Sequence, residues 1–160
     1  MKITTEKIKL ILELHAKYLQ KEQDGECADL SYYDLSGSDF SYVDLTGAMF
    51  SRSNCSDTNF SYSNLTDTML THVNFSGANF SYSNITRANF AYASLPHTDF
   101  TGANPTRADF TNANLSTFVP IFADATRKRV LYYMPNSTPP VYIVKWYTFT
   151  SGISKNRNKS

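Results

Sequence analysis

The chain has 160 residues, the length of one domain, and its 15 basic and 14 acidic residues leave a formal net charge of +1. Ser, Thr and Asn supply 48 residues, but 11 Tyr and 11 Phe are too many rings for a disordered chain. No apolar run reaches the roughly 18 residues of a membrane span, and residues 1–14 lack the apolar core of a signal peptide. We therefore expect a cytoplasmic protein, and its two cysteines, Cys27 and Cys55, are too few for a disulfide framework.

Residues 4–23 have the pattern of an amphipathic helix. Thr4 or Thr5 would cap its first turn, Glu6 lies near its positive end, and Gly25 follows as a helix-ending residue. Because the polar face mixes Lys and Glu, a membrane-surface helix is the weaker alternative, and we expect residues 1–24 to cap the domain that follows. The apolar stripe that would face this domain consists of Ile8, Ile11, Leu12, His15 and Leu19.

A large apolar residue then recurs at every fifth position from Leu30 to Leu115 without a change of register. Leu, Phe or Ile fills 16 of these 18 positions, and Cys55 and Pro105 are the exceptions. The residue two positions earlier is Ala, Ser, Thr or Val in 17 of 18 units, and the residue one position earlier is Asp or Asn in 15. A period of five fits neither a helix nor a strand, so the chain must turn after every unit and return each large side chain to a common axis.

The units "SGANF", "TRANF", "TGANP" and "TRADF" resemble the pentapeptide-repeat family, whose units have the form A-(D/N)-L-x-x. The resemblance covers about residues 28–117. It implies an all-β fold, a right-handed quadrilateral β-solenoid with four units per coil, in which the large residue and the small one before it point inward. The 18 units would make about four and a half coils. The order of helix, short Gly-containing linker and coils also resembles many phage and prophage members of the family.

Four units per coil place residues that are 20 apart in the sequence above one another. The sequence supports this spacing, because "NFSYSN" begins at Asn59 and again at Asn79. Adjacent coils should lie about 4.8 Å apart. We expect an inward column of Phe40, Phe60, Phe80 and Phe100, and an outward tyrosine ladder of Tyr42, Tyr62 and Tyr82. On the next face we expect a column of Asp67, Arg87 and Arg107.

Residues 119–160 depart from the repeat. The runs "RVLYYM" and "VYIVKWYTF" are rich in β-formers and are separated by the turn-forming segment "PNSTPP". We expect residues 25–118 to form the solenoid, residues 119–149 a β-hairpin that caps its last coil with Trp146 packed against it, and residues 150–160 a flexible basic tail. The alternative for the hairpin is a homodimer contact, as in relatives that pair through their C-termini.

Catalytic and cofactor motifs are absent from the sequence, which contains no P-loop, GxGxxG, HExxH or CxxC pattern. His15, His72 and His97 fall on a helix and on two different solenoid faces, which argues against a metal cluster. Cys55 takes an inward position, which predicts a buried structural thiol. We therefore expect no enzyme activity, no cofactor and no metal.

Charge divides unevenly along the chain, because residues 25–118 carry a net −6 and residues 119–160 a net +6. The leading hypothesis is a non-catalytic protein-binding module that modulates or inhibits a host protein. Its sharpest version follows from the family resemblance, since members that protect or inhibit DNA gyrase mimic DNA as an acidic rod in the DNA-binding saddle. Two alternatives are weak nucleic-acid binding through the basic C-terminus and a structural or assembly role.

Two sets of residues are candidates for partner binding. Tyr is enriched at protein interfaces and three in a row form a sizeable exposed patch, although mutual stacking on a regular surface would also explain the ladder. The first coil would carry one carboxylate on each of its four sides, and the repeat alone does not explain why later coils carry mostly Asn. These candidates are Tyr42, Tyr62, Tyr82, Asp29, Asp34, Asp39 and Asp44.

Overall fold

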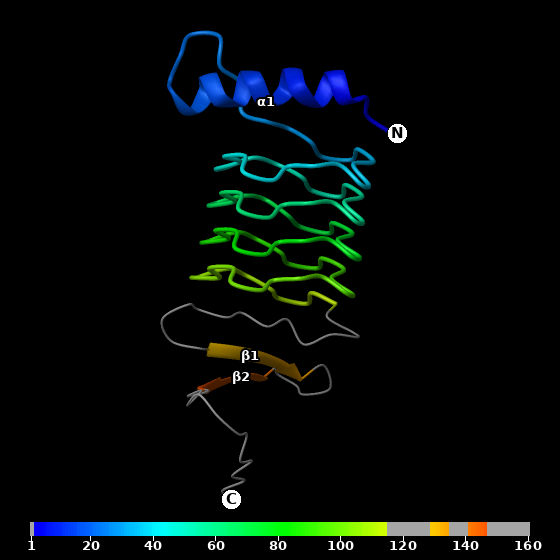
Figure 1. The fold of residues 1–160 in the computed structure, drawn as a ribbon, viewed down its shortest axis with the longest axis vertical. Helices are drawn as coiled ribbons and strands as arrows, with labels where there is room; N and C mark the ends of the chain where they lie inside the picture. The colour runs from blue at the N-terminus through cyan, green and yellow to red at the C-terminus, as the bar shows by residue number, and fades with distance from the viewer. Residues whose placement is uncertain (1, 115–128, 135–140, 147–160) are drawn as a thin grey trace, which may run out of the picture.

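A stack of short turns lies between one helix and a pair of strands in the described part of the computed structural model (Figure 1). The structure describes residues 2–114 in full, and the backbone of residues 129–134 and 141–146. Helix α1 spans Thr5–Leu19, strand β1 spans Arg129–Met134 and strand β2 spans Val141–Trp146.

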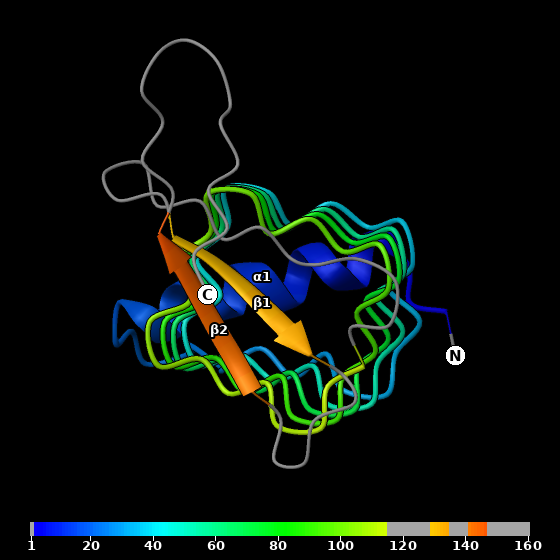
Figure 2. The same cartoon turned by 90° about the horizontal axis from the view of Figure 1, so that it is seen from below.

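Residues 28–114 wind into stacked coils, each of which takes 20 residues. Parallel bridges join positions that are 20 apart, from Asp29 with Met49 to Ser94 with Asn114. The N–H of Leu30 donates to the carbonyl of Met49 at 2.7 Å, and the N–H of Met49 donates to the carbonyl of Ala28 at 2.9 Å. Viewed along their axis, the coils superpose in one closed outline (Figure 2). The five-residue period therefore builds a β-solenoid.

Regular strand is scarce in the coils because each side contributes one bridge before the chain turns again. The turns have a positive φ at every fifth position from Tyr32 to Asn112, the corner positions of the solenoid. At these corners, 13 non-glycine residues and four glycines have φ between 56° and 73°. The expected inward and outward alternation is thus maintained over short segments instead of long strands.

A column of stacked phenylalanine rings fills the solenoid. Phe40, Phe60, Phe80 and Phe100 have ring centroids 4.8–5.3 Å apart and planes within 12° of parallel. The rings of Phe50, Phe75 and Phe90 meet this column edge-on. All seven rings are buried, which confirms the predicted inward positions.

Small buried residues complete the core, and several of their hydroxyls donate to backbone carbonyls. The Thr58 hydroxyl donates to the carbonyl of Leu35 at 3.0 Å, and the Ser63 hydroxyl donates to the carbonyl of Phe60 at 2.6 Å. Burial of these hydroxyls therefore leaves no unsatisfied donor, which would otherwise cost about 1–3 kcal/mol.

Helix α1 is shorter than the sequence pattern predicts. Thr4 is its N-cap, and the Thr4 hydroxyl accepts the N–H of Lys7 at 3.2 Å. The helix ends at Leu19 with Gln20 as its C-cap, so the predicted end at residue 23 is wrong. The reason is that Lys21 adopts a φ of 61°, which turns the chain out of the helix.

Gly25 does not end the helix but allows the returning chain to pass close to it. A Cβ atom on Gly25 would lie 2.2 Å from the backbone nitrogen of Tyr18. One residue later, the N–H of Glu26 donates to the carbonyl of Leu14 at 3.0 Å. The glycine is thus required for close approach of two backbones.

Helix α1 lies across the N-terminal end of the coils (Figure 1). The N–H of Ile3 donates to the carbonyl of Asp34 at 3.3 Å, and the N–H of Ala28 donates to Nδ1 of His15 at 3.1 Å. Ile3 and His15 are buried. Three further residues of the predicted stripe are partly buried against the core, namely Ile8, Ile11 and Leu12.

Strands β1 and β2 pair antiparallel, from Arg129 opposite Trp146 to Met134 opposite Val141. The predicted pairing of these two segments is confirmed for the backbone. The predicted packing of the Trp146 side chain and the predicted tail at residues 150–160 lie outside the described residues.

Candidate functional site: the tyrosine ladder and its flanking faces

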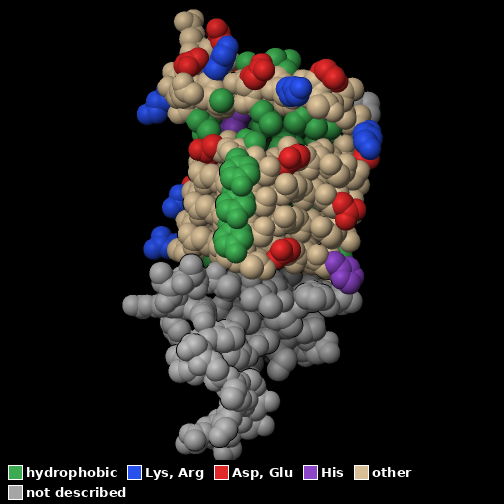
Figure 3. All heavy atoms as spheres, viewed as in Figure 1, with side chains coloured by type: hydrophobic (Ala, Val, Ile, Leu, Met, Phe, Trp, Pro, Cys, Tyr) green, Lys and Arg blue, Asp and Glu red, His purple; other side chains and the backbone are tan. Residues whose placement is uncertain are grey.

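The tyrosine ladder runs along one corner of the solenoid. The rings of Tyr42 and Tyr62 have centroids 4.9 Å apart, and those of Tyr62 and Tyr82 are 5.1 Å apart, with planes within 12° of parallel. The three residues are 76%, 50% and 55% exposed in chain order. Figure 3 shows a vertical stripe of hydrophobic side chains along the coils, with further hydrophobic side chains above it, beneath the helix. The predicted geometry of the ladder is confirmed.

The turn at this corner does not itself require tyrosine. Tyr42, Tyr62 and Tyr82 have φ values of 57–61°, a left-handed conformation that costs an L-residue about 1–2 kcal/mol. Stacking of neighbouring rings offsets part of this cost, by about 0.5–1.5 kcal/mol per pair. The next residue of the column is Gly102, where a Cβ atom would lie 2.6 Å from the Tyr82 ring. Glycine therefore serves the same turn, and the tyrosines contribute through their side chains.

Two solenoid faces meet at the tyrosine ladder. The acidic face consists of the outward columns that start at Asp39 and Ser41, together with the corner column of Gly37, Asp57, Gly77 and His97. The Asn–Thr face consists of Asp44, Thr46, Asn64, Thr66, Asn84, Thr86, Asn104 and Thr106.

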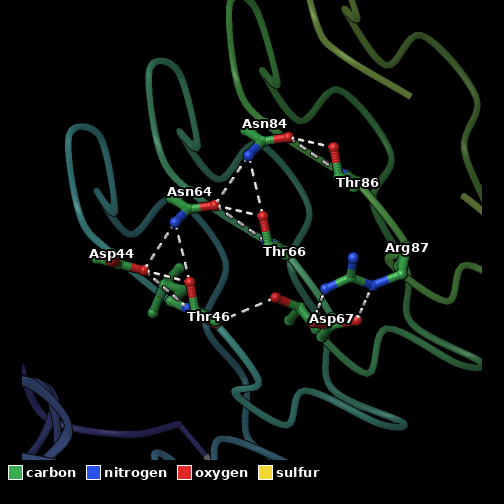
Figure 4. A network of polar contacts seen from close by, with 10 residues as sticks. Asp44, Thr46, Asn64, Thr66, Asp67, Asn84, Thr86 and Arg87 are labelled. Carbon is green, nitrogen blue, oxygen red and sulfur yellow. Dashed lines mark hydrogen bonds and ion pairs between the residues drawn. The ribbon is translucent and has the colours of Figure 1, made fainter. Parts of the chain in front are cut away.

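A continuous hydrogen-bond network covers the Asn–Thr face (Figure 4). The amide of Asn64 donates to Oδ1 of Asp44 at 3.1 Å and to Oγ1 of Thr46 at 2.9 Å. The amide of Asn84 repeats this pattern with Asn64 and Thr66 at 3.2 and 2.9 Å. Because these polar groups are paired with one another, the Asn–Thr face is a stabilising ladder and the weaker of the two candidate surfaces.

Aspartates of the first coil stand at the start of columns of hydrogen-bonded Asn side chains. This position explains why they are aspartate and not asparagine. Oδ1 of Asp34, Asp39 and Asp44 accepts the amide of the Asn one coil further on, at 3.0–3.1 Å. Each ladder amide donates toward the preceding coil, and the first coil has no such coil before it. A first residue therefore needs only acceptors, which a carboxylate supplies. Asp29 is the exception, since Met49 follows it in its column.

The first-coil carboxylates do not form one site. Asp39 and Asp44 lie on the two faces that meet at the tyrosine ladder, whereas Asp29 and Asp34 belong to the other two faces. Sequence reasoning missed Asp57 and Asp99, which belong to the acidic face together with Asp39. Residues that are 20 apart share a column, so sorting the acidic residues by column would have placed Asp57 and Asp99 on the same face as Asp39.

The predicted column of Asp67 and Arg87 forms an ion pair at the edge of the Asn–Thr face (Figure 4). Nε of Arg87 donates to Oδ1 of Asp67 at 2.6 Å, and the second guanidinium nitrogen pairs with Oδ2. Both side chains are about half exposed, so water and salt screen the pair and it contributes little to stability.

Metal-ligating side chains are not brought together in the described residues. Among these residues, no group of three or more His, Cys, Asp and Glu side chains is placed to hold a metal ion. Cys55 is buried as predicted, and burial raises the pKa of its thiol to about 12. No helix in the same part of the chain has the length and apolar character needed to cross a bilayer.

A family model of pentapeptide repeats, in 8 copies, matches residues 28–67, 50–86 and 83–117, which together are more than half of the chain. The chain belongs to the pentapeptide-repeat family. This finding confirms the family resemblance noted in the five-residue units. No curated protein matches the sequence.

Several solved pentapeptide-repeat structures are similar to this one. Rfr23 from the cyanobacterium Cyanothece 51142 has 26% identity and a TM-score of 0.55, over 56% of this chain and 60% of that one. HetL from the cyanobacterium Nostoc sp. strain PCC 7120, a protein involved in heterocyst differentiation regulation, has 30% identity and a TM-score of 0.52, over 53% of this chain and 39% of that one. QnrB1, a plasmid-mediated fluoroquinolone resistance protein, has 24% identity and a TM-score of 0.47, over 56% of this chain and 54% of that one. The matched region thus spans less than two thirds of each of these proteins.

Proposed function

We propose that this pentapeptide-repeat protein is a non-catalytic protein-binding module that engages its partner through the tyrosine ladder. The observation that carries the proposal is the ladder itself, three stacked and exposed rings at corners where glycine would serve. Family membership supports a binding role over catalysis.

The physical properties of the ladder suit an interface. Tyrosine offers a large amphipathic surface with a hydroxyl that donates and accepts hydrogen bonds, and it is enriched in protein interfaces. Stacking at 4.9 and 5.1 Å already restrains the rings of Tyr42, Tyr62 and Tyr82 before a partner arrives. Because immobilising a flexible side chain costs about 0.5–1.5 kcal/mol on binding, this prior ordering favours association.

Affinity capture tests the proposal. Tagged full-length protein is used to capture partners from host-cell lysate, and the captured proteins are identified by mass spectrometry. The double variant Tyr62→Ala/Tyr82→Ala should lose a partner that the unmodified protein retains. The matched control is Tyr92→Ala, because Tyr92 is equally exposed and stacks on His72 at a different corner. Retention of every partner by the double variant would remove the ladder as the binding surface.

The flanking elements have a supporting role in this proposal. We propose that residues 1–24 and 119–149 cap the solenoid of residues 25–118, because an open end would expose apolar side chains and unpaired backbone groups. The contacts of Ile3 and His15 with the first coil support the N-terminal cap. A homodimer contact through the C-terminal segment is the alternative role for residues 119–149. The cytoplasm is the proposed location.

Mimicry of DNA toward a DNA-handling enzyme such as DNA gyrase is the second candidate function. The observation that favours it is the net charge of −6 in residues 25–118. Under this proposal, added protein inhibits supercoiling by gyrase, and the inhibition weakens as the salt concentration rises. Unchanged enzyme activity at micromolar protein would exclude mimicry toward gyrase and leave the binding role of the ladder intact.

A further inference from the structure

Charge is distributed unequally over the four faces of the solenoid. The acidic face carries Asp39, Asp57 and Asp99, and none of its described outward residues is Lys or Arg. The Asn–Thr face and its far corner balance two Asp with Arg87 and Arg107. Each of the two remaining faces also includes a cation: Arg52 at the corner that follows the face of Asp29, and Lys2, whose backbone forms a bridge with that of Asp34.

Hydrogen bonds fix two of the three carboxylates of the acidic face, those of Asp39 and Asp99. Oδ1 of Asp39 accepts the N–H of Ser41 at 2.9 Å and the amide of Asn59 at 3.0 Å. Oδ1 of Asp99 accepts the N–H of Thr101 at 2.8 Å. These contacts with described residues use one oxygen of each carboxylate. The bonds from Ser41 hold the pKa of Asp39 below its usual value, so Asp39 is ionised at neutral pH.

We propose that the acidic face and the tyrosine ladder together bind an extended, arginine-bearing segment of the partner protein that runs along the solenoid axis. This inference rests on the proposed function and names the chemistry of its partner. A guanidinium pairs with a carboxylate through two parallel hydrogen bonds and also packs on aromatic rings. An ammonium group lacks the planar geometry for both contacts. Nucleic acid is disfavoured at this surface, because fixed carboxylates repel phosphates.

The dimensions of the surface fit such a segment. Asp39 and Asp99 are three coils apart, a distance of about 14 Å along the axis at roughly 4.8 Å per coil. Alternate residues of an extended peptide are about 6.8 Å apart, so three arginines at alternate positions also span about 14 Å. The ladder column has Tyr42, Tyr62 and Tyr82 in the first three of these coils and Gly102 in the coil of Asp99. The first two arginines would therefore lie between carboxylates and tyrosine rings, and the third would pair with Asp99 beyond the end of the ladder.

Fluorescence anisotropy with synthetic peptides tests this inference on the full-length protein. The probe is a labelled peptide of about ten residues in which Arg and Ser alternate, long enough to cover the ladder in extended form. The same peptide with Lys in place of Arg keeps the charge but removes the planar fork. We expect the Arg peptide to bind at least about fivefold more tightly than the Lys peptide, with an affinity that falls as salt rises.

A matched pair of variants separates the proposed surface from general attraction to an acidic protein. Tyr62→Ala/Asp99→Asn should weaken binding of the Arg peptide about tenfold. Tyr92→Ala/Asp109→Asn removes the same groups from another part of the solenoid and should change binding less than about twofold. Circular dichroism and thermal unfolding establish that both variants remain folded.

The remaining outcomes overturn the inference. Equal loss of binding in the two variants would show non-specific electrostatic attraction, and equal binding of the Arg and Lys peptides would exclude guanidinium recognition. Absence of peptide binding would also contradict it. So would competition by single-stranded DNA, if Tyr62→Ala/Asp99→Asn abolishes that competition, because the surface would then bind nucleic acid. If lysate capture still depends on Tyr62 and Tyr82 in these cases, the proposed function stands and only the partner chemistry is wrong.

Discussion

Nδ1 of His15 accepts a hydrogen bond from the backbone N–H of Ala28 at 3.1 Å, and this bond joins α1 to the start of the first coil. His15 is buried, and its Nε2 atom has no hydrogen-bond partner. Because Nδ1 is the acceptor, the neutral ring carries its proton on Nε2. Protonation of Nδ1 would break the bond to Ala28 and place a charge under the helix.

The docking of α1 should weaken in mild acid. Burial lowers the pKa of His15, and the nearby Asp44 carboxylate opposes the shift without reversing it. The unfolded chain, with a His pKa of about 6.5, therefore binds the proton first as the pH falls. The contribution of neutral His15 to the free energy of unfolding is therefore fully present above about pH 6.5 and is lost progressively below it. Amide hydrogen exchange of residues 5–19 should be faster at about pH 5 than at about pH 7, after correction for the intrinsic rate.

His15→Asn is the control for this prediction, because its side-chain oxygen can accept the N–H of Ala28 but does not titrate. The variant keeps His72 and His97, so any pH dependence they cause is common to both proteins. Equal pH dependence of α1 exchange in the variant and the unmodified protein would contradict the role assigned to His15.

On the Asn–Thr face, each Asn side-chain amide donates toward the preceding coil. This direction predicts that Asp and Asn are not interchangeable along a column. Asn64→Asp removes the amide that donates to Asp44 and Thr46, and places a second carboxylate beside Asp44. It should lower the free energy of unfolding by about 1 kcal/mol or more. Asp44→Asn at the start of the column keeps an acceptor and should cost less than about 0.5 kcal/mol. Urea unfolding of the two variants measures the difference, and equal costs would contradict the directional ladder.

The phenylalanine column predicts a large cost for opening a cavity at its centre. The ring of Phe80 contacts those of Phe60, Phe75, Phe90 and Phe100. Phe80→Ala should lower the free energy of unfolding by about 3–5 kcal/mol, and Phe80→Leu should cost less because it leaves a smaller cavity. Thermal and urea unfolding give both values, and a cost below about 1 kcal/mol for Phe80→Ala would contradict close packing along the axis.

The two thiols should differ in reactivity. Cys55 is buried with its pKa raised by burial to about 12, and its Sγ atom is 3.2 Å from the Ser53 hydroxyl. Cys27 is partly exposed, although burial also raises its pKa. Titration of the folded protein with a thiol reagent should therefore modify Cys27 alone, and denaturant should release the second thiol. Rapid modification of both in the folded state would contradict the burial of Cys55.

Much of the fold was predictable because one rule repeats along the chain. A five-residue repeat with 20 residues per coil is enough to assign the core column of Phe40, Phe60, Phe80 and Phe100. The same rule assigns Tyr42, Tyr62 and Tyr82 to one corner. The end of α1 and the role of Gly25 were not predictable in this way. They depend on a single left-handed residue, Lys21, and on the close passage of two backbones, which have no periodic signal.

The candidate site was predictable only in part. The tyrosine ladder follows from the 20-residue columns, but the first-coil aspartates share a sequence position without sharing a face. Their common feature is hydrogen bonding at the start of a ladder, which depends on the direction of amide donation and not on composition. The grouping of Asp57 and Asp99 with Asp39 requires the corner and side columns to be considered together.

The dissociation constant of the captured partner is the most direct test of the claim that the tyrosine ladder is the binding surface. It is measured by titration calorimetry for the unmodified protein, for Tyr62→Ala/Tyr82→Ala and for Tyr92→Ala. We predict that the double variant binds at least about tenfold more weakly, whereas Tyr92→Ala stays within about twofold. Equal affinities of the double variant and the unmodified protein would contradict the claim.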